Sequence, residues 1–388
     1  MDDMTTLAHV NGDVVSWAIE RASLTRASVA ARLSSEESPI TESLVAKWED
    51  GRAPLSLRKA LDFARIVCIP FGYLFLSSPP TENLPIPDLR RVGDTKLTSL
   101  SVDFREVLNA AILKQQWFRE YQLAIKADPV AIVGTFTIKD AVEDVAKSIR
   151  ATLRIDKNMR SEAKTAPQLV TSIARHAEQF GILVMRSGIV GSNNDRKLSE
   201  KEFRGFAISD PLAPLIFINT NDAYTAQVFT CVHELVHIWL GTSGVSNVES
   251  SALTQHFEAV EEFCNAVAAS VLAPRDLFLD AWHLLKSAKA VASHFRISQQ
   301  VVLRRAYGLG LLRQDEFLRM FSAVSNKGKA KASGGIFHYS LPSRNSPRFT
   351  RTILDELKNG RLLYRDAARF LAVKPNTLIG LMNSKTGE

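Results

Sequence analysis

The sequence predicts a mostly helical α+β protein: an N-terminal helical bundle, a core with a small mixed or antiparallel sheet, and a C-terminal helical region. Apolar residues recur at helical spacing along most of the chain. Three short apolar runs between positions 182 and 219 are instead typical of strands. A proline-rich segment at 79–98 and an apolar-poor segment at 326–335 interrupt the pattern. The 388 residues are enough for two or three domains of about 150 residues.

Residues 1–78 are expected to form the helical bundle. Apolar positions recur at helical spacing from residue 13 to residue 76, and Thr25 and Thr41 are suited to be helix N-caps. Four prolines between positions 79 and 87 exclude a regular helix or a central strand, so we interpret 79–98 as a linker. Residues 99–165 are predicted to be a helical connecting region.

Residues 166–325 are expected to form the core, and they begin with a helix at 167–180. The predicted strands are Ile182–Met185, Arg204–Ser209 and Leu215–Asn219. Two strongly apolar helices follow at about 223–240 and 252–273, and residues 284–320 are again helical. Residues 326–388 are predicted to be a flexible linker and a basic helical tail.

The tail from residue 344 onward has nine basic and four acidic residues, a net charge of 9 − 4 = +5. Its pattern is that of helix, turn and helix. Contact with nucleic acid, contact with a protein partner and a solvated appendage are three alternatives for it.

Composition excludes several classes of protein. With 46% apolar and 23% charged residues, the chain is neither disordered nor fibrous. The net charge of +7 permits contact with nucleic acid without requiring it. Three cysteines without a CxxC pair indicate a reducing compartment. Met1–Val10 has no apolar region of the kind a signal peptide needs, and no apolar run reaches membrane-span length. We therefore expect a cytoplasmic protein with no membrane partner.

The motif His233-Glu234-Leu235-Val236-His237 is the strongest chemical signal in the sequence. On a helix, positions i and i+4 lie on one face, so both imidazoles can reach one Zn²⁺, and Glu234 lies beside them. The surrounding helix is almost wholly apolar, which predicts that it is buried. Burying His and Glu side chains is costly unless they are paired or bind a metal, so the sequence predicts a zinc site.

A third protein ligand is expected on the next helix, which offers Glu258, Glu261, Glu262 and Cys264. We choose Glu261 because it shares a face with Asn265, whose amide is placed to hydrogen-bond a metal-binding imidazole. The alternative for Glu258 and Glu262 is a solvated helix face.

Two histidines and one glutamate leave a fourth position open, as in catalytic zinc sites. Zinc lowers the pKa of water, and Glu234 is expected to take the proton of the attacking water and to deliver it to the leaving amine of a peptide bond. We expect an edge strand near Leu215–Asn219 to align an extended substrate, although the sequence does not identify the edge.

These residues resemble the ImmA/IrrE metallopeptidase family. The resemblance rests on Gly205–Ala207, Leu215–Asn219, Phe229–Gly241 and Glu261–Pro274, and it extends over about 165–310. It implies a zincin-like peptidase core in which Glu261, the first residue of an E-x-x-[AC]-N run, is the third zinc ligand. One departure is that Ala226, Gln227 and Val228 stand where the family often has basic residues.

The N-terminal segment Trp48–Pro54 resembles the W-E-x-G-x-x-P pattern of XRE-type helix-turn-helix domains. The resemblance implies a recognition helix at about Thr41–Asp50. Its candidate nucleic-acid contacts are Thr41, Glu42, Ser43 and Lys47, with Arg52 just after it. The connection at 34–40 is longer than the usual tight turn and contains Glu36 and Glu37, which disfavour a phosphate backbone. DNA binding and protein contact are both open for this module.

Together the resemblances imply a zinc-dependent regulatory endopeptidase. It would cleave a partner protein, namely a helix-turn-helix repressor or an antitoxin, in a stress, phage or toxin–antitoxin circuit. The alternative is a DNA-binding antitoxin or transcriptional regulator that uses the peptidase fold as a protein-binding scaffold. Intact His233, Glu234, His237 and Glu261 favour the enzyme, because a scaffold has no physical need for Glu234.

Overall fold

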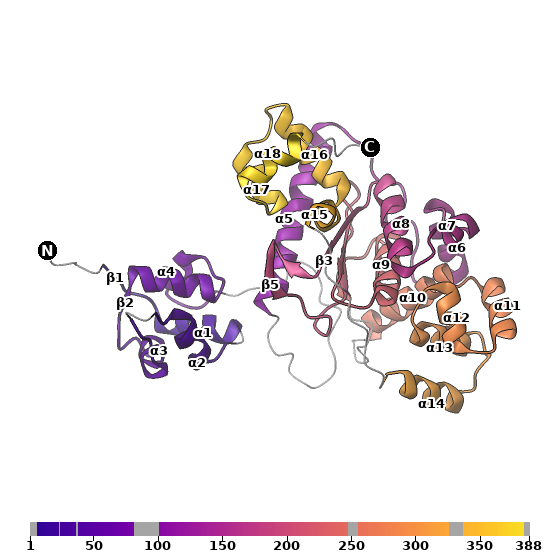
Figure 1. Cartoon of the computed structure of the whole chain (residues 1–388), viewed down its shortest axis with the longest axis horizontal. Helices are drawn as coiled ribbons and strands as arrows, with labels where there is room; N and C mark the ends of the chain where they lie inside the picture. Colours follow the sequence, from indigo (N-terminus) through magenta and orange to yellow (C-terminus); the bar gives the residue numbers. More distant parts are fainter. Residues whose placement is uncertain are drawn as a thin grey trace. The chain divides into compact units, whose positions relative to one another are not determined.

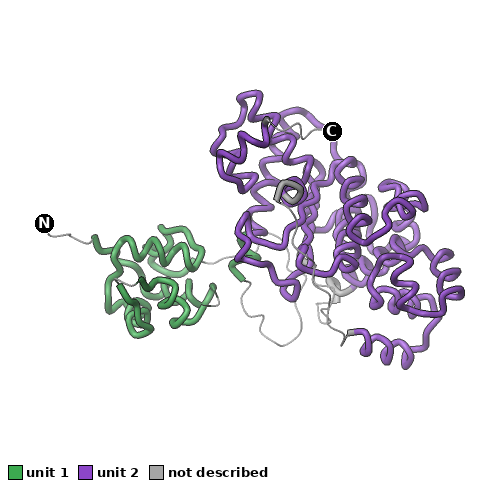
Figure 2. The backbone as a smooth tube through the Cα atoms, viewed as in Figure 1, with its two compact units in different colours: residues 1–85, 96–106 green, residues 86–95, 107–388 purple. Residues whose placement is uncertain are grey.

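The computed structural model of the chain describes residues 6–22, 24–35, 38–80, 101–246, 255–325 and 337–383. These residues form a mostly helical α+β structure, which confirms the predicted fold class. The chain divides into two units, residues 1–85 with 96–106 and residues 86–95 with 107–388 (Figure 2). Glu36, Glu37, the linker positions 81–98 and the segment 326–335 lie outside the described residues.

The first unit is a bundle of four short α-helices, and Thr25 and Thr41 cap two of them as expected. Each hydroxyl accepts a hydrogen bond from a backbone N–H three residues on, at Ser28 and at Leu44. Trp48 is buried in the small core. The elements are α1 (Gly12–Arg21), α2 (Arg26–Leu33), α3 (Glu42–Glu49), α4 (Leu57–Ile66), the 3₁₀ helix η1 (Phe71–Phe75) and the antiparallel pair β1 (Leu7–Ala8) and β2 (Leu55–Ser56).

A four-stranded mixed sheet lies at the centre of the second unit. Its strands β3 (Leu183–Ser187), β6 (Gly205–Ile208), β7 (Leu215–Asn219) and β8 (Gly244–Ser246) are ordered β3-β7-β6-β8. β3 is parallel to β7, and the other two pairs are antiparallel. Because β7 lies between two strands, Leu215–Asn219 is not an edge of the sheet.

Helices cover both faces of this sheet (Figure 1). On one side lie α8 (Ala166–Gln179) and α9 (Tyr224–Trp239), and on the other side lie α5 (Val102–Ala124) and α15 (Phe337–Asn345). The sheet residues Val184, Ile216 and Ile218 share one apolar core with Val232 and Leu235 of α9. Apolar side chains of the sheet and of neighbouring helices surround α9, and every α9 residue from Gln227 to Trp239 is buried.

The predicted connecting region is continuous with this core. Helices α6 (Val142–Thr152) and α7 (Lys157–Glu162) contribute Val145, Ile149 and Met159 to the core that also contains residues of α10 (Gln255–Leu272). The sequence-based boundary at residue 165 therefore does not fall between compact units. The helices that follow are α11 (Arg275–Leu285), α12 (Ala288–Phe295), α13 (Gln299–Gly308) and α14 (Gln314–Ser325).

The C-terminal helices are packed against the sheet layer. Lys114 Nζ on α5 donates to Asn345 Oδ1 at 2.7 Å, and Glu178 on α8 accepts the Arg348 N–H at 2.7 Å. Phe349 is fully buried, so the alternative of a solvated appendage is wrong. The remaining elements are α16 (Pro347–Lys358), α17 (Tyr364–Leu371), α18 (Pro375–Asn383) and the hairpin of β4 (Ile189–Val190) and β5 (Asn193–Lys197). Over the described ranges, every helix is too short or too polar to cross a membrane.

Candidate metal centre

Helix α9 presents the two motif histidines on one buried face. His233 and His237 lie one turn apart and have no exposed surface, and every residue from Gln227 to Trp239 is buried. Their Nε2 atoms are 3.2 Å apart. Two imidazoles with converging ring nitrogens in an apolar setting need a shared partner to offset their desolvation.

Helix α10 supplies that partner. Glu261 Oε2 is 3.2 Å from His233 Nε2, and Glu261 Oε1 is 3.2 Å from His237 Nε2. The Glu261 side chain is 11% exposed. Three donors from two helices thus converge on one point, and they are the one group of this kind within the part of the chain that the structure describes.

The spacing of the donors fits a tetrahedral ion. Ligand atoms at about 2.1 Å from a tetrahedral Zn²⁺ lie about 3.4 Å from one another. The three observed separations of 3.2 Å are close to that value. Two imidazole nitrogens and one carboxylate are also a ligand set that zinc accepts with a fourth position left open.

The electrostatics favour the protonation states of metal ligands. Burial lowers the pKa of His237, against the opposing effect of Glu261. Burial alone would raise the pKa of the Glu261 carboxyl, but His233 and His237 together bring it below its usual range. A neutral imidazole and an ionised carboxylate are the forms that bind a cation.

Thr242 orients one of the imidazoles. Gly241 takes a left-handed conformation with φ +68° at the end of α9, and the chain then turns back so that the Thr242 N–H donates to His237 O at 2.9 Å. The Thr242 hydroxyl is 3.0 Å from His237 Nδ1, the nitrogen that faces away from the cluster. Sequence reasoning missed this residue, and the glycine after the motif was the available signal.

Asn265 does not take the role expected for it. Its Oδ1 is buried and makes no hydrogen bond to any described residue, so neither imidazole is its partner here. Cys264 Sγ lies 3.8 Å from His237 Nδ1, on the outer side of the ring, which excludes it from the converging donor set. Glu262 is exposed, in agreement with the alternative of a solvated helix face. The Glu258 side chain lies outside the described residues.

Glycine at position 205 makes room for Glu234. A Cβ built on Gly205 would lie 2.6 Å from Glu234 Oε1 and 2.8 Å from Phe217 O. The carboxylate therefore rests directly against the backbone of β6. Glu234 has no exposed surface, and any side chain at position 205 would displace its carboxylate.

A buried ion pair fixes the start of α9. Arg204 Nε lies 3.3 Å from Asp222 Oδ2, and the two side chains are 7% and 2% exposed. Gln227 Nε2 donates to Asp222 O at 2.8 Å. Gln227, at a position where the family often has a basic residue, is thus used to hold the segment that enters the helix.

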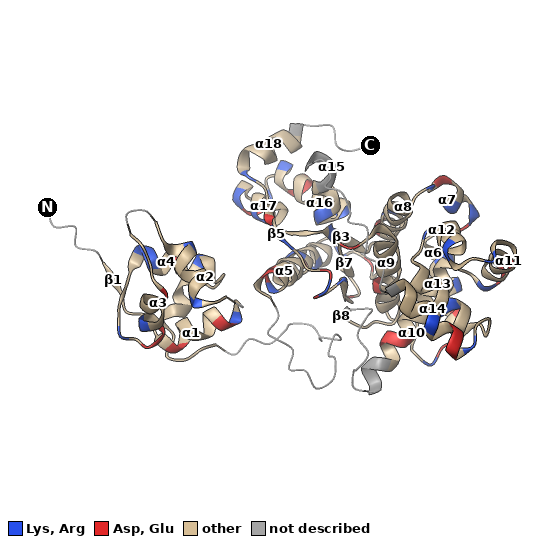
Figure 3. Ribbon diagram, turned by 60° about the horizontal axis from the view of Figure 1, so that its bottom comes forward, with Lys and Arg blue, Asp and Glu red and all other residues tan. Residues whose placement is uncertain are grey.

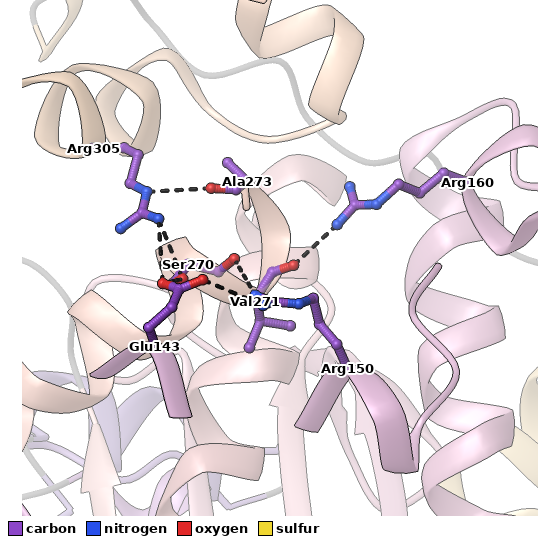
Figure 4. A network of polar contacts seen from close by, with 7 residues as sticks. All are labelled: Glu143, Arg150, Arg160, Ser270, Val271, Ala273 and Arg305. Carbon is purple, nitrogen blue, oxygen red and sulfur yellow. Dashed lines mark hydrogen bonds and ion pairs between the residues drawn. The ribbon is translucent and has the colours of Figure 1, made fainter. Parts of the chain in front are cut away.

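Three arginines hold the other end of α10. Arg150, Arg160 and Arg305 donate to the carbonyls of Ser270, Val271 and Ala273 at 2.9, 3.0 and 3.2 Å (Figure 4). Cations at a helix C-terminus satisfy unpaired carbonyls and interact favourably with the helix dipole. This network anchors the helix that presents Glu261.

The candidate nucleic-acid contacts lie in the first unit, apart from this cluster. All four residues, Thr41, Ser43, Lys47 and Arg52, are exposed. Thr41 is the N-cap of α3, Ser43 and Lys47 lie on the helix, and Arg52 follows its end. The Thr41 hydroxyl caps the helix. Their exposure leaves both DNA contact and protein contact open.

The comparisons with known proteins agree with this geometry. Residues 177–307 match the IrrE N-terminal-like domain. The matched range contains His233, His237 and Glu261, and the family is a metallopeptidase family. A second family model, described as a domain of unknown function (DUF8813), matches residues 345–384. No curated protein and no solved structure matches the chain.

The chain therefore contains an IrrE N-terminal-like, metallopeptidase-type domain whose buried cluster is compatible with a bound metal.

Proposed function

We propose that the protein is a zinc-dependent endopeptidase that cleaves one or a few partner proteins. The observation that supports this most directly is the convergence of His233, His237 and Glu261. These three residues would hold the ion. Zinc bound there supplies a Lewis acid that polarises a peptide carbonyl and acidifies water.

The chain's own residues would perform the proton transfers. Glu234 takes a proton from the attacking water and delivers it to the nitrogen of the leaving amine. Its position against the backbone at Gly205 restricts the carboxylate to one location. Thr242 keeps the His237 ring oriented through Nδ1, so that Nε2 faces the cluster.

An edge strand close to the cluster suits an extended substrate. β8 follows α9 directly and is the last strand of the sheet among those described. Its outer edge is available for an antiparallel peptide. We propose that the substrate backbone pairs there, which would bring a peptide bond to the metal.

The partner is proposed to be a helix-turn-helix repressor or an antitoxin in a stress, phage or toxin–antitoxin circuit. The first unit supports recruitment rather than catalysis, since its exposed residues Ser43, Lys47 and Arg52 are not part of the metal cluster. It would dock on the substrate protein or on the DNA to which that substrate is bound.

Metal content tests the site. We expect about one zinc per chain by mass spectrometry in the wild type and none in His233→Ala or Glu261→Ala. Glu262→Ala is the matched control, because it removes an exposed carboxylate from the same helix and should retain the metal. A wild type that stays metal-free after zinc is supplied would contradict the proposal.

Cleavage is then tested with helix-turn-helix repressors and antitoxins from the same genome as candidate substrates. We expect cleavage by the wild type and none by Glu234→Gln, which should still bind zinc. If Glu234→Gln retains the full biological effect, the DNA-binding or scaffold alternative replaces the enzyme.

A further inference from the structure

The last two helices are joined by a tight turn. α17 ends at Leu371, three residues follow, and α18 begins at Pro375. Ala372 has φ +51° and ψ 48°, and the next N–H, of Val373, donates back to Ala368 O at 3.0 Å. A connection of three or four residues between two packed helices is typical of a helix-turn-helix. In the first unit, by contrast, eight residues separate α2 from α3.

Packing decides which face of α18 meets solvent. Leu378 and Leu381 are buried with Leu371 of α17. The opposite face is exposed, and it consists of Pro375, Asn376, Ile379 and Gly380. Asn376 and Gly380 are separated by one helical turn, so they form one surface with Ile379. None of these four residues is charged, and the described ribbon of α18 has neither the basic nor the acidic colour in Figure 3.

Basic residues border that surface. Residues 345–383 contain seven Lys or Arg and three Asp or Glu. Two of the acids are paired, Glu356 with Arg361 and Asp366 with Arg365. Within the described ranges, the exposed Arg369 and Lys374 form no ion pair; Arg369 lies in the last turn of α17, and Lys374 is the last residue of the connection to α18.

The β4–β5 hairpin is fixed against the same turn. The Ser192 hydroxyl donates to Ala372 O, and Arg344 donates to Gly191 O at 2.8 Å. Ser192, Arg369, Lys374 and Thr377 lie around an open cleft of ≈ 570 Å³ at this junction. The hairpin therefore borders the cleft that Arg369 and Lys374 line.

We propose that α17 and α18 bind double-stranded DNA, with α18 in the major groove. Asn376 is placed to read a base edge, since an amide pairs with adenine through two hydrogen bonds. Arg369 and Lys374, which line one cleft at the turn, contact phosphates along one edge of the groove. A protein partner is disfavoured, because Ile379 is the one large apolar residue on the exposed α18 face and interfaces depend on buried aromatic or Arg anchors. The inference goes beyond the proposed peptidase and does not depend on it.

Fluorescence anisotropy of the full chain with a labelled random-sequence 30-base-pair duplex tests the proposal. We expect Arg369→Ala/Lys374→Ala to weaken binding at least about tenfold at 0.1 M salt. The slope of log affinity against log salt should fall in magnitude by about 1.8, because two phosphate contacts are lost. Both residues are exposed, so circular dichroism should show an unchanged Tm.

Two matched variants separate the possible sources of binding. Lys147→Ala removes an exposed charge from α6 and should bind as the wild type does. Lys47→Ala/Arg52→Ala removes two charges from the first unit. If that variant loses all binding while Arg369→Ala/Lys374→Ala loses none, the proposal is overturned.

Two further outcomes would also overturn it: equal affinity for a single-stranded 30-mer, and no duplex binding by the wild type. Glu234→Gln should bind the duplex unchanged, so a failure of this inference is distinguishable from a failure of the proposed peptidase.

Discussion

Thr242 is the residue whose replacement tests the metal centre most directly. In Thr242→Val, the side chain keeps its shape and loses the oxygen that lies 3.0 Å from His237 Nδ1. Cys264 Sγ, 3.8 Å from the same nitrogen, is only a weak acceptor. Loss of the Thr242 hydroxyl removes a hydrogen bond from a buried imidazole, at a cost of about 1–3 kcal/mol.

That cost appears as lost zinc affinity, because metal binding requires Nε2 to be free of its proton and therefore places the proton on Nδ1. We expect a decrease of about 10- to 100-fold in zinc affinity, the usual effect of removing a partner that orients a ligand. Competition against a chromophoric chelator at neutral pH measures it without any knowledge of the substrate.

Thr242→Ser is the control, since it keeps the hydroxyl and should bind zinc within about threefold of the wild type. Thermal unfolding of both apo variants checks that the fold is intact. Wild-type affinity in Thr242→Val would refute the role of this contact, and with it the account of how His237 is oriented.

Three further predictions concern the scaffold. Asp222→Asn removes the negative charge from the buried ion pair with Arg204, so urea denaturation should show that the free energy of unfolding falls by about 3–5 kcal/mol, and a decrease below about 1 kcal/mol would refute this. Gly205→Ala forces a Cβ against Glu234 Oε1 and the Phe217 carbonyl, so the free energy of unfolding should fall by about 1–3 kcal/mol and cleavage should be abolished. Cleavage at the wild-type rate would contradict this. Burial, with a contribution from a nearby arginine, lowers the pKa of Lys114 from 10.5 to about 8 in the folded chain. Between those values the unfolded chain binds more protons, so the free energy of unfolding should rise with pH from about 8 to 10.5, and Lys114→Met should remove that rise.

The sequence was sufficient for elements whose signal is local. α9 was predicted because it is apolar all round and ends at Gly241, and the strand Leu215–Asn219 was predicted to the residue. Five strands were not predicted. β1, β2, β4 and β8 have two or three residues, which are too few to show a period, and β5 (NNDRK) has five residues, none of them apolar.

Within the metal centre, the spacing of the motif was enough to predict His233 and His237 as ligands, because positions i and i+4 share a face on any helix. Glu261 needed a choice among several acids on one helix, and only the packing of α10 on α9 places one of its oxygens 3.2 Å from His233 and the other 3.2 Å from His237.

The sequence by itself therefore determined the helices, the main strands and the chemistry of the two histidines, since these depend on neighbours within a few residues. The tertiary structure alone decided that Thr242 rather than Asn265 faces an imidazole, that Gly205 lies against Glu234, and that residues 341–381 pack on the sheet layer. Such contacts join positions tens of residues apart, and their geometry is set by how whole elements pack, which no local pattern encodes.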